Sequence, residues 1–525
     1  MPDTHPPGGG AATRVARRIP DLTSGPVAPT LLMFALPLLG SNILQSMNGT
    51  ANAIWVSHSL GEAALTATSN ANQVFFLMLG AAFGAAMAAN IMIAQAIGAR
   101  DEAQAKRVVG TATAFFLVLS VVVGSVGAAL TPAILDLMGT PPDARPQAVA
   151  YLRVIFAALP FIYLFTFLMM AQRATGDSRT PFWFSLLNVA LDVTLNPLLI
   201  LGIGPLPRLG VAGSATATLL AQSLTLAAML WLLHRRRSLL VLRRSEWRLL
   251  LPDLRIVTAL VGKGAPMALQ MMIMSLAAVS MMSLVNAYGS HTAAAYGAAL
   301  QLWTYVQMPG MALSGAVSSM AAQNVGAGRM DRVERVALIG AGFAVLLTAL
   351  PVVLIQALGP LPLMLFLPAS SPSLPIAAHL NGYVLWSFIP FVIAFVLAGV
   401  ARATGAVWPP LIAMVAGLWG LRVPFANLLR PSLGADAIWI SFPVSSSAIC
   451  LFAIAYYRFG GWRRARMLDT RPHGDVADTG MAPPSGVEET EIAQAAAEAL
   501  SDPGRSTPRT PASEVRGGGD RSTRG

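Results

Sequence analysis

Long apolar runs alternate with short polar segments along most of the chain. Each run can form a helix of about 20 residues, which is enough to cross a hydrocarbon core of about 30 Å. Counting these runs predicts twelve membrane-spanning helices. Their expected limits are 28–52, 66–94, 107–131, 148–172, 181–202, 210–233, 256–287, 292–321, 334–358, 376–401, 407–429 and 435–457. The pattern therefore predicts an all-α membrane protein.

The composition supports a membrane protein and argues against a soluble enzyme. Hydrophobic residues make up 55% of the 525 residues and charged residues only 11%, against roughly 25% in an average soluble domain. The single cysteine, Cys450, excludes an internal disulfide. The sequence has no GxSxG, HExxH, Walker or CxxC motif, so we predict no catalytic residue, metal site or cofactor. Without a nucleotide site, any transport must draw on a gradient of protons or sodium.

The net charge of +11 lies mainly in loops, where it indicates membrane orientation rather than nucleic-acid binding. Alternate loops are rich in arginine and lysine. These basic residues are Arg100, Lys106, Arg107, Arg173, Arg179, those of 235–263, Arg329, Arg332, Arg335 and Arg402. The intervening loops contain only Arg145, Arg208 and Arg430. We therefore expect both termini in the cytoplasm and the chain in a cell inner membrane, which agrees with an even number of spans.

Three segments outside the predicted spans have distinct compositions. Residues 1–27 and 468–525 contain few large apolar side chains, and we expect them to be disordered cytoplasmic tails. The basic segment 234–263 separates the sixth and seventh spans. We expect it to form an amphipathic linker on the cytoplasmic membrane surface.

An internal repeat divides the spans into two sets of six. QAIGARDEAQAKRV at 95–108 resembles QNVGAGRMDRVERV at 323–336, and RATGDSRTP at 173–181 resembles RATGAVWPP at 402–410. Pro37 and Pro266 keep nearly the same spacing. Because six is even, both copies enter the membrane in the same direction, as in parallel transporter repeats. We predict two pseudo-symmetric six-helix lobes, at 28–233 and 264–460.

One acidic residue, Asp192, lies near the middle of a predicted span. Asn188 and Asn196 lie one helical turn to either side, on the same face. Ionisable groups inside a membrane are costly and typically functional, so we predict that these three residues couple transport to an ion. The carboxylate could take up a proton or, with amide oxygens around it, ligate sodium. The amides alone are equally compatible with hydrogen bonds between helices.

Further polar side chains within the spans are candidates for contact with a substrate. Those of the first span recur at steps of three to four residues and form a polar stripe. Arg422 is a cation inside the eleventh span, the repeat partner of the fifth, where it could pair with backbone carbonyls or line a cavity. The candidates are Gln45, Asn48, Asn52, Gln73, Gln270, Gln301 and Arg422.

The motifs in both halves resemble those of the multidrug and toxic compound extrusion (MATE) transporters. They include NAIWVSHSLGEAAL at 52–65, IAQAIGARD at 93–101, NPLLILG at 196–202, LGVAGSATAT at 209–218 and AAQNVGAG at 321–328. The resemblance covers about residues 28–460. It implies two six-helix lobes around a central cavity. It also implies export of organic cations or other amphipathic small molecules, driven by protons or sodium, by a chain that we expect to be a monomer.

The resemblance has one departure and leaves alternatives open. Many family members carry an aspartate in the first span where this chain has Asn52, and an amide cannot exchange a proton near neutral pH. We therefore favour proton coupling at Asp192. The alternatives are sodium coupling, a lipid-linked saccharide flippase of the same superfamily, or a non-transporting membrane scaffold.

Overall fold

The computed structural model describes residues 21–60, 62–202, 207–242 and 244–468. The predicted disordered tails therefore lie largely outside the described residues. The described part contains helices and no strand, in agreement with the predicted all-α class. Eleven of its helices are long and apolar enough to span a membrane. The remaining long helix, Ser290–Gly326, has 37 residues and matches the others in length, so the twelve predicted spans are confirmed as helices.

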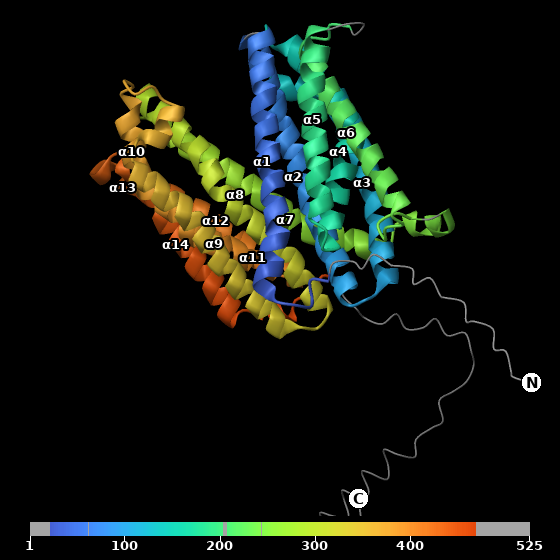
Figure 1. Ribbon diagram of the computed structural model, residues 1–525. Coiled ribbons are helices and arrows are strands. Elements are labelled where there is room, and N and C mark those ends of the chain that lie inside the picture. Colours follow the sequence, from blue (N-terminus) through green and yellow to red (C-terminus); the bar gives the residue numbers. More distant parts are fainter. Residues whose placement is uncertain (1–20, 61, 203–206, 243, 469–525) are drawn as a thin grey trace, which may run out of the picture. The chain divides into compact units, whose positions relative to one another are not determined.

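Six helices form the first half of the chain (Figure 1). They are α1 (Val27–Leu60), α2 (Glu62–Gly98), α3 (Glu102–Leu137), α4 (Arg145–Ala174), α5 (Arg179–Leu201) and α6 (Val211–Arg235). α1 to α4 extend beyond their predicted limits at both ends, whereas α5 and α6 agree with theirs to within two residues at each end. Local chemistry sets the boundaries: Asp101 caps α3 by accepting the Gln104 N–H at 2.8 Å, and Gly202 ends α5 in the left-handed region.

The second half contains interrupted helices. Its elements are α7 (Leu254–Asn286), α8 (Ser290–Gly326), α9 (Met330–Leu358), η2 (Leu361–Leu365), α10 (Ser373–Val384), η3 (Leu385–Ser387), α11 (Phe388–Thr404), α12 (Trp408–Val415), η4 (Ala416–Arg422), α13 (Val423–Leu433), α14 (Asp436–Phe459) and η5 (Gly461–Arg464). α10, η3 and α11 together make one span, as do α12, η4 and α13. η4 is a π-helical segment, a rare form that is frequent at functional sites.

The two halves meet through the repeated motifs at the ends of α2 and α8. A Cβ atom on Gly98 would lie 1.9 Å from the Gln323 carbonyl oxygen, and one on Gly326 would lie 1.9 Å from that of Gln95. The Gln95 side chain donates to the Ala403 carbonyl at 2.7 Å. Only glycine permits such a close approach of two backbones. The repeated motifs thus form a joint, which we call the α2–α8 joint.

The apolar cores show that this contact is confined to one end of the helices. A continuous core combines residues of α2 and α4 with residues of α8 and α11. A separate core lies at the opposite end of the second half, and its buried residues, within 281–306, 352–388 and 426–442, all come from that half. The halves therefore share a core beside the basic loops, and the far end of the second half has a core of its own. Figure 1 shows α1 to α6 gathered on one side of this joint and α8 to α14 on the other.

Two predicted boundary segments differ from the structure. Residues 21–26 belong to the packed chain: Leu22 is buried, and the Asn324 side chain donates to its carbonyl at 3.2 Å. The predicted linker 234–263 contains only a short helix, η1 (Arg244–Leu250), before α7 begins at Leu254. η1 packs on α3, where Lys106 forms an ion pair with Glu246. Leu240 of the segment is buried in the protein, whereas Trp247 and Leu251 are exposed, so the expected contact with the membrane surface stays a prediction.

We expect Gly98→Ala and Gly326→Ala each to destabilise the α2–α8 joint. The added methyl group meets a backbone carbonyl that has no rotamer to change, and overpacking of this kind costs about 1–3 kcal/mol. The midpoint of thermal unfolding in detergent, followed by tryptophan fluorescence, should fall. Gly315→Ala in α8 is the matched control because a Cβ there meets open space, and its midpoint should stay or rise. Equal unfolding midpoints for all three variants would contradict the close backbone contact at the α2–α8 joint.

Candidate functional site

The Asp192 carboxylate lies inside the first half, between three helices. Its residue is only 2% exposed. Thr218 of α6 donates its hydroxyl to the carboxylate at 3.0 Å, and the Asn48 side chain of α1 lies within hydrogen-bonding reach. Within the described part of the chain, no arginine, lysine or histidine forms an ion pair with Asp192. The carboxylate is therefore held by neutral donors alone.

Other polar side chains surround this carboxylate. Ser214, one turn before Thr218 on α6, donates to the Asn52 amide oxygen of α1 at 2.7 Å. The buried Tyr151 hydroxyl of α4 is close enough to Asp192 for electrostatic interaction and lies within reach of Asn52. We call Asn48, Asn52, Tyr151, Asp192, Ser214 and Thr218 the Asp192 cluster. It draws on α1, α4, α5 and α6, so its geometry depends on the packing of the whole half.

Several oxygen atoms beside the Asp192 cluster lack a partner. The side-chain oxygens of Asn48, Asn188 and Asn196 are buried and accept no hydrogen bond from any described residue. Buried oxygens normally have such a partner. A carboxylate together with free amide oxygens can accept hydrogen bonds from water or a hydrated proton, and it can also ligate a small cation.

The structure gives Asn188 and Asn196 positions different from those the sequence suggested. Asn196 donates to the backbone carbonyl of Asp192 at 2.9 Å rather than to its carboxylate. Asn188 makes no hydrogen bond to Asp192 within the described residues. The two residues that do contact the carboxylate, Asn48 and Thr218, lie on other helices. Asn48 and Asn52, predicted as substrate contacts, belong with Asp192.

Sequence reasoning did not identify Tyr151, Ser214 or Thr218. A signal for the two hydroxyls was present: Ser214 and Thr218 lie four residues apart on one face of a predicted span and inside the LGVAGSATAT motif. Tyr151 had no comparable signal, because it begins an apolar run in which an aromatic residue is usual.

The predicted substrate contacts fall into two groups. The first group has exposed side chains and consists of Gln45 on α1, Gln73 on α2 and Gln301 on α8. Among the described residues, none of the three forms a hydrogen bond to a member of the Asp192 cluster. Gln270 and Arg422 lie in the second half. Gln270 is buried on α7, whereas Arg422 ends η4.

Arg422 contacts side chains of α14 rather than backbone carbonyls. Its guanidinium donates to the Ser445 hydroxyl at 2.8 Å and to the Ser446 hydroxyl at 3.4 Å. The guanidinium carbon lies 4.2 Å from the centre of the Phe442 ring, which is a cation–π contact. All of these partners are neutral.

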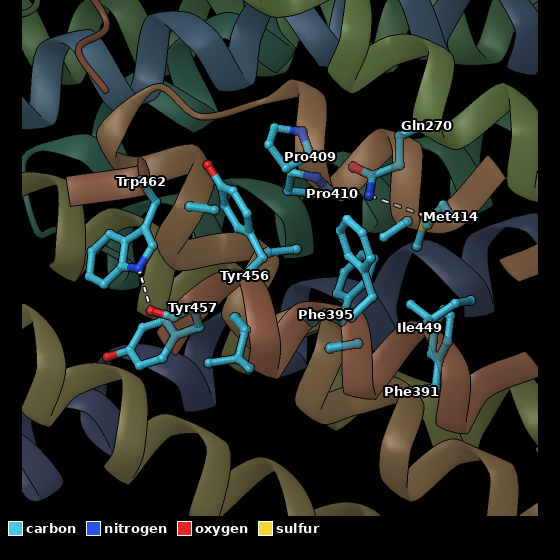
Figure 2. A pocket seen from close by; sticks show the side chains of 17 residues that line it. Gln270, Phe391, Phe395, Pro409, Pro410, Met414, Ile449, Tyr456, Tyr457 and Trp462 are labelled. Carbon is cyan, nitrogen blue, oxygen red and sulfur yellow. Dashed lines mark hydrogen bonds between the residues drawn. The ribbon is translucent and has the colours of Figure 1, made fainter. Parts of the chain in front are cut away.

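The second half also contains a small pocket with an apolar lining. It lies among α7, α11, α12, α14 and η5, and Figure 2 shows the side chains around it. Its aromatic lining consists of Phe391, Phe395, Phe452, Tyr456, Tyr457 and Trp462. The only amide in the lining is Gln270, whose side-chain nitrogen lies 3.1 Å from the Met414 sulfur.

Comparison with known proteins supports both the repeat and the fold. The family model MatE matches residues 37–198 and 266–428, which together are more than half of the chain. Both segments begin at the repeated prolines, Pro37 and Pro266, so one model matches each copy of the repeat.

Two relatives from Bacillus subtilis (strain 168) align over most of the chain. The chain is 34% identical over 441 residues to the probable multidrug resistance protein YoeA, with 83% of this chain and 95% of the relative covered. It is 30% identical over 453 residues to the probable multidrug resistance protein YpnP, with 85% and 98% covered.

A solved structure has the same fold. It is described as the outward-facing conformation of a multidrug resistance MATE family transporter, and it matches with a TM-score of 0.77 at 21% identity. The match covers 83% of this chain and 96% of that chain. Since the family model, the relatives and the fold agree, the chain belongs to the MatE family of multidrug and toxic compound extrusion transporters and is a multi-pass membrane transporter rather than an enzyme.

Proposed function

We propose that this chain exports cationic or amphipathic small molecules in exchange for protons, with Asp192 as the coupling residue. The observation that carries the proposal is a buried carboxylate whose partners among the described residues are all neutral. Transfer of a carboxylate from water into a protein interior without a compensating positive charge costs free energy. Uptake of a proton neutralises the carboxylate and removes that cost. Neutral donors such as Thr218 can remain bonded to either protonation state.

Coupling requires that the state of Asp192 affects the contact between the halves. α1 supplies Asn48 and Asn52 to the Asp192 cluster, and it packs against α5 of its own half and α8 of the other. A change in the hydrogen bonds of the cluster therefore acts on a helix that touches both halves. Pro197 follows Asn196 and removes one backbone donor from α5, which favours bending at that point.

The direction of transport follows from the charged loops. The α2–α8 joint lies beside the arginine-rich loops, which the positive-inside rule assigns to the cytoplasm of a cell inner membrane. In this arrangement both termini are cytoplasmic, the halves are closed toward the cytoplasm, and the separate core of the second half lies toward the outside. Protons would reach Asp192 from outside, and substrate would leave on the same side.

The relatives support drug efflux rather than the other functions considered from the sequence. YoeA and YpnP are both named as probable multidrug resistance proteins. That similarity favours efflux over a saccharide flippase or a scaffold without transport activity.

Sodium coupling is the second candidate, and a specific observation favours it. Asn48, which reaches the carboxylate, has an unpaired buried side-chain oxygen, and so do Asn188 and Asn196, one turn to either side of Asp192 on α5. Oxygen atoms of this kind are the ligands that hard cations prefer. The two candidates therefore share one site and differ in the ion that neutralises it.

We expect Asp192→Asn to abolish efflux driven by a pH gradient, because an amide cannot bind and release a proton in this range. The measurement is dye efflux from proteoliposomes, with empty liposomes as background. Asp136→Asn is the control, since Asp136 is an exposed acid paired with Arg145 outside the cluster. Undiminished efflux by the Asp192 variant would remove this residue from the mechanism.

We expect a pH gradient imposed alone to drive efflux and a sodium gradient imposed alone to leave it at background. Reconstituted protein in vesicles of defined internal and external buffer allows each gradient to be set separately. If sodium drives efflux at constant pH, the coupling ion is sodium and the unpaired amide oxygens are its ligands.

A further inference from the structure

The segment that leads into α1 lies on the second half of the chain. We call residues 21–25 the α1 anchor. Leu22 is 3% exposed, and its N–H donates to the Gln323 side-chain oxygen of α8 at 3.3 Å. Its carbonyl accepts from the Asn324 side chain at 3.2 Å. The first helix of the first half is therefore attached, just before it begins, to the end of a helix of the second half.

Two arginines of the second half hold the next three carbonyls of the anchor. Arg329 donates to the Thr23 carbonyl at 2.7 Å. Arg332, in the first turn of α9, donates to the Ser24 and Gly25 carbonyls, each at 2.8 Å. Hydrogen bonds from a charged donor are stronger than those between neutral groups. Because the acceptors are backbone atoms, these bonds fix the path of the chain itself.

α1 thus contacts a different half at each of two places along its length. Leu31 is fully buried, and one of its methyl carbons lies 3.6 Å from where a Cβ of Gly340 in α9 would be. Asn48 and Asn52 lie about 25–30 Å farther along the helix, where they belong to the Asp192 cluster of the first half. One rigid helix therefore connects the Asp192 cluster with the second half.

The arginine contacts are specific to α1. In the aligned motifs 95–108 and 323–336, the positions of the two arginines are occupied in the first copy by Asp101 and Gln104. The segment before α7 also reaches the other half, since η1 packs on α3. However, Leu251, which follows Leu22 at the repeat spacing of 229 residues, is 72% exposed. The helix with this anchor is the one that supplies Asn48 and Asn52.

We propose that the α1 anchor transmits changes at the Asp192 cluster to the second half, with Arg329 and Arg332 as positioning residues. When an ion binds or leaves, the hydrogen bonds between the cluster and α1 change. A helix fixed on α8 and α9 passes that change on, whereas a helix with a loose end moves alone. The inference rests on the proposed coupling at Asp192 and adds the contact that carries it between the halves.

Dye efflux by the full chain in proteoliposomes, under the ion gradient that drives the unaltered protein, tests the anchor. Arg332→Gln should lower turnover by roughly threefold to tenfold and leave KM for the dye unchanged, because the anchor does not bind substrate. Arg335→Gln, one turn later on the exposed face of α9, is the matched control and should change neither value. Equal turnover in both variants, or a changed KM in Arg332→Gln, would overturn the positioning role.

Gly25→Ala weakens the anchor without removing an arginine. Gly25 has a φ of 72°, a conformation that alanine adopts only with strain, and a Cβ there meets open space. Turnover should therefore fall as in Arg332→Gln, again at unchanged KM. This variant also decides the case in which Arg332→Gln fails to fold, as judged by thermal unfolding in detergent. Unaltered turnover in Gly25→Ala would contradict the anchor.

A covalent tether distinguishes an anchor from a gate that must open. Cys450→Ala removes the only native cysteine, and Thr23→Cys with Arg329→Cys then places thiols at the two sides of one anchor contact. Turnover should be reduced in this variant and should return to that of Cys450→Ala when a short bifunctional thiol reagent links the two cysteines. A monofunctional reagent should not restore it. Arrest of efflux by the link would show that the anchor must leave α9, and the inference would fail.

Failure of the anchor and failure of the proposed function give different results. If only the anchor is wrong, Asp192→Asn abolishes efflux while Arg332→Gln matches Arg335→Gln. If Asp192→Asn retains efflux, the coupling residue is wrong and the inference falls with it, whatever the anchor variants do.

Discussion

The close approach of α2 and α8 is the contact on which the arrangement of the two halves depends. Gly98 and Gly326 let each helix end pack directly on the backbone of the other, at Gln323 and Gln95. The glycines and glutamines belong to the repeated motif, so the two copies make reciprocal contacts, as expected for parallel halves related by a pseudo-two-fold axis. A carbonyl has no rotamers, and the contact therefore tolerates little change in side-chain size.

Charge divides the two halves in a way that their shared fold does not. The first half holds its only central acid, Asp192, with hydroxyl and amide groups. The second half holds Arg422 in the repeat partner of that span, with hydroxyl groups as its hydrogen-bond partners, whereas the buried Arg402 has a counterpart in the first half, Arg173 of the repeated RATG motif. In an apolar medium each uncompensated charge favours a mobile partner of opposite sign. One fold thus carries opposite charges at the centres of its two repeat-related spans.

The helices were largely predictable from the sequence, because twelve apolar runs and a duplicated motif are strong signals over many residues. Asp192 was predictable because it is an acid within an apolar run. Its partners were not, since Asn48 and Thr218 reach it from helices far apart in the sequence. The periodicity of α5 suggested Asn188 and Asn196 as partners instead. The Asn196 side chain, one turn away on the same helix, donates to the backbone carbonyl of Asp192 and not to its carboxylate.

Other differences have similar physical causes. The basic linker was expected to form an amphipathic segment, and its short helix η1 is also held on α3 by the ion pair of Glu246 with Lys106. Leu22 falls in a stretch rich in glycine and proline, and composition alone gave no reason to expect its burial against α8. In both cases a tertiary contact decided the outcome, and a local sequence pattern carries no information about such a contact.

The π-helical segment η4 has a consequence for the comparison of the two repeats. A π-turn contains one more residue than an α-turn can hold, so the helix that follows it is rotated relative to a regular continuation. Arg422 is the last residue of η4 and lies in the span that repeats the one holding Asp192. The wider turn therefore sets the direction of its guanidinium differently from that of a side chain at the same depth of a regular helix.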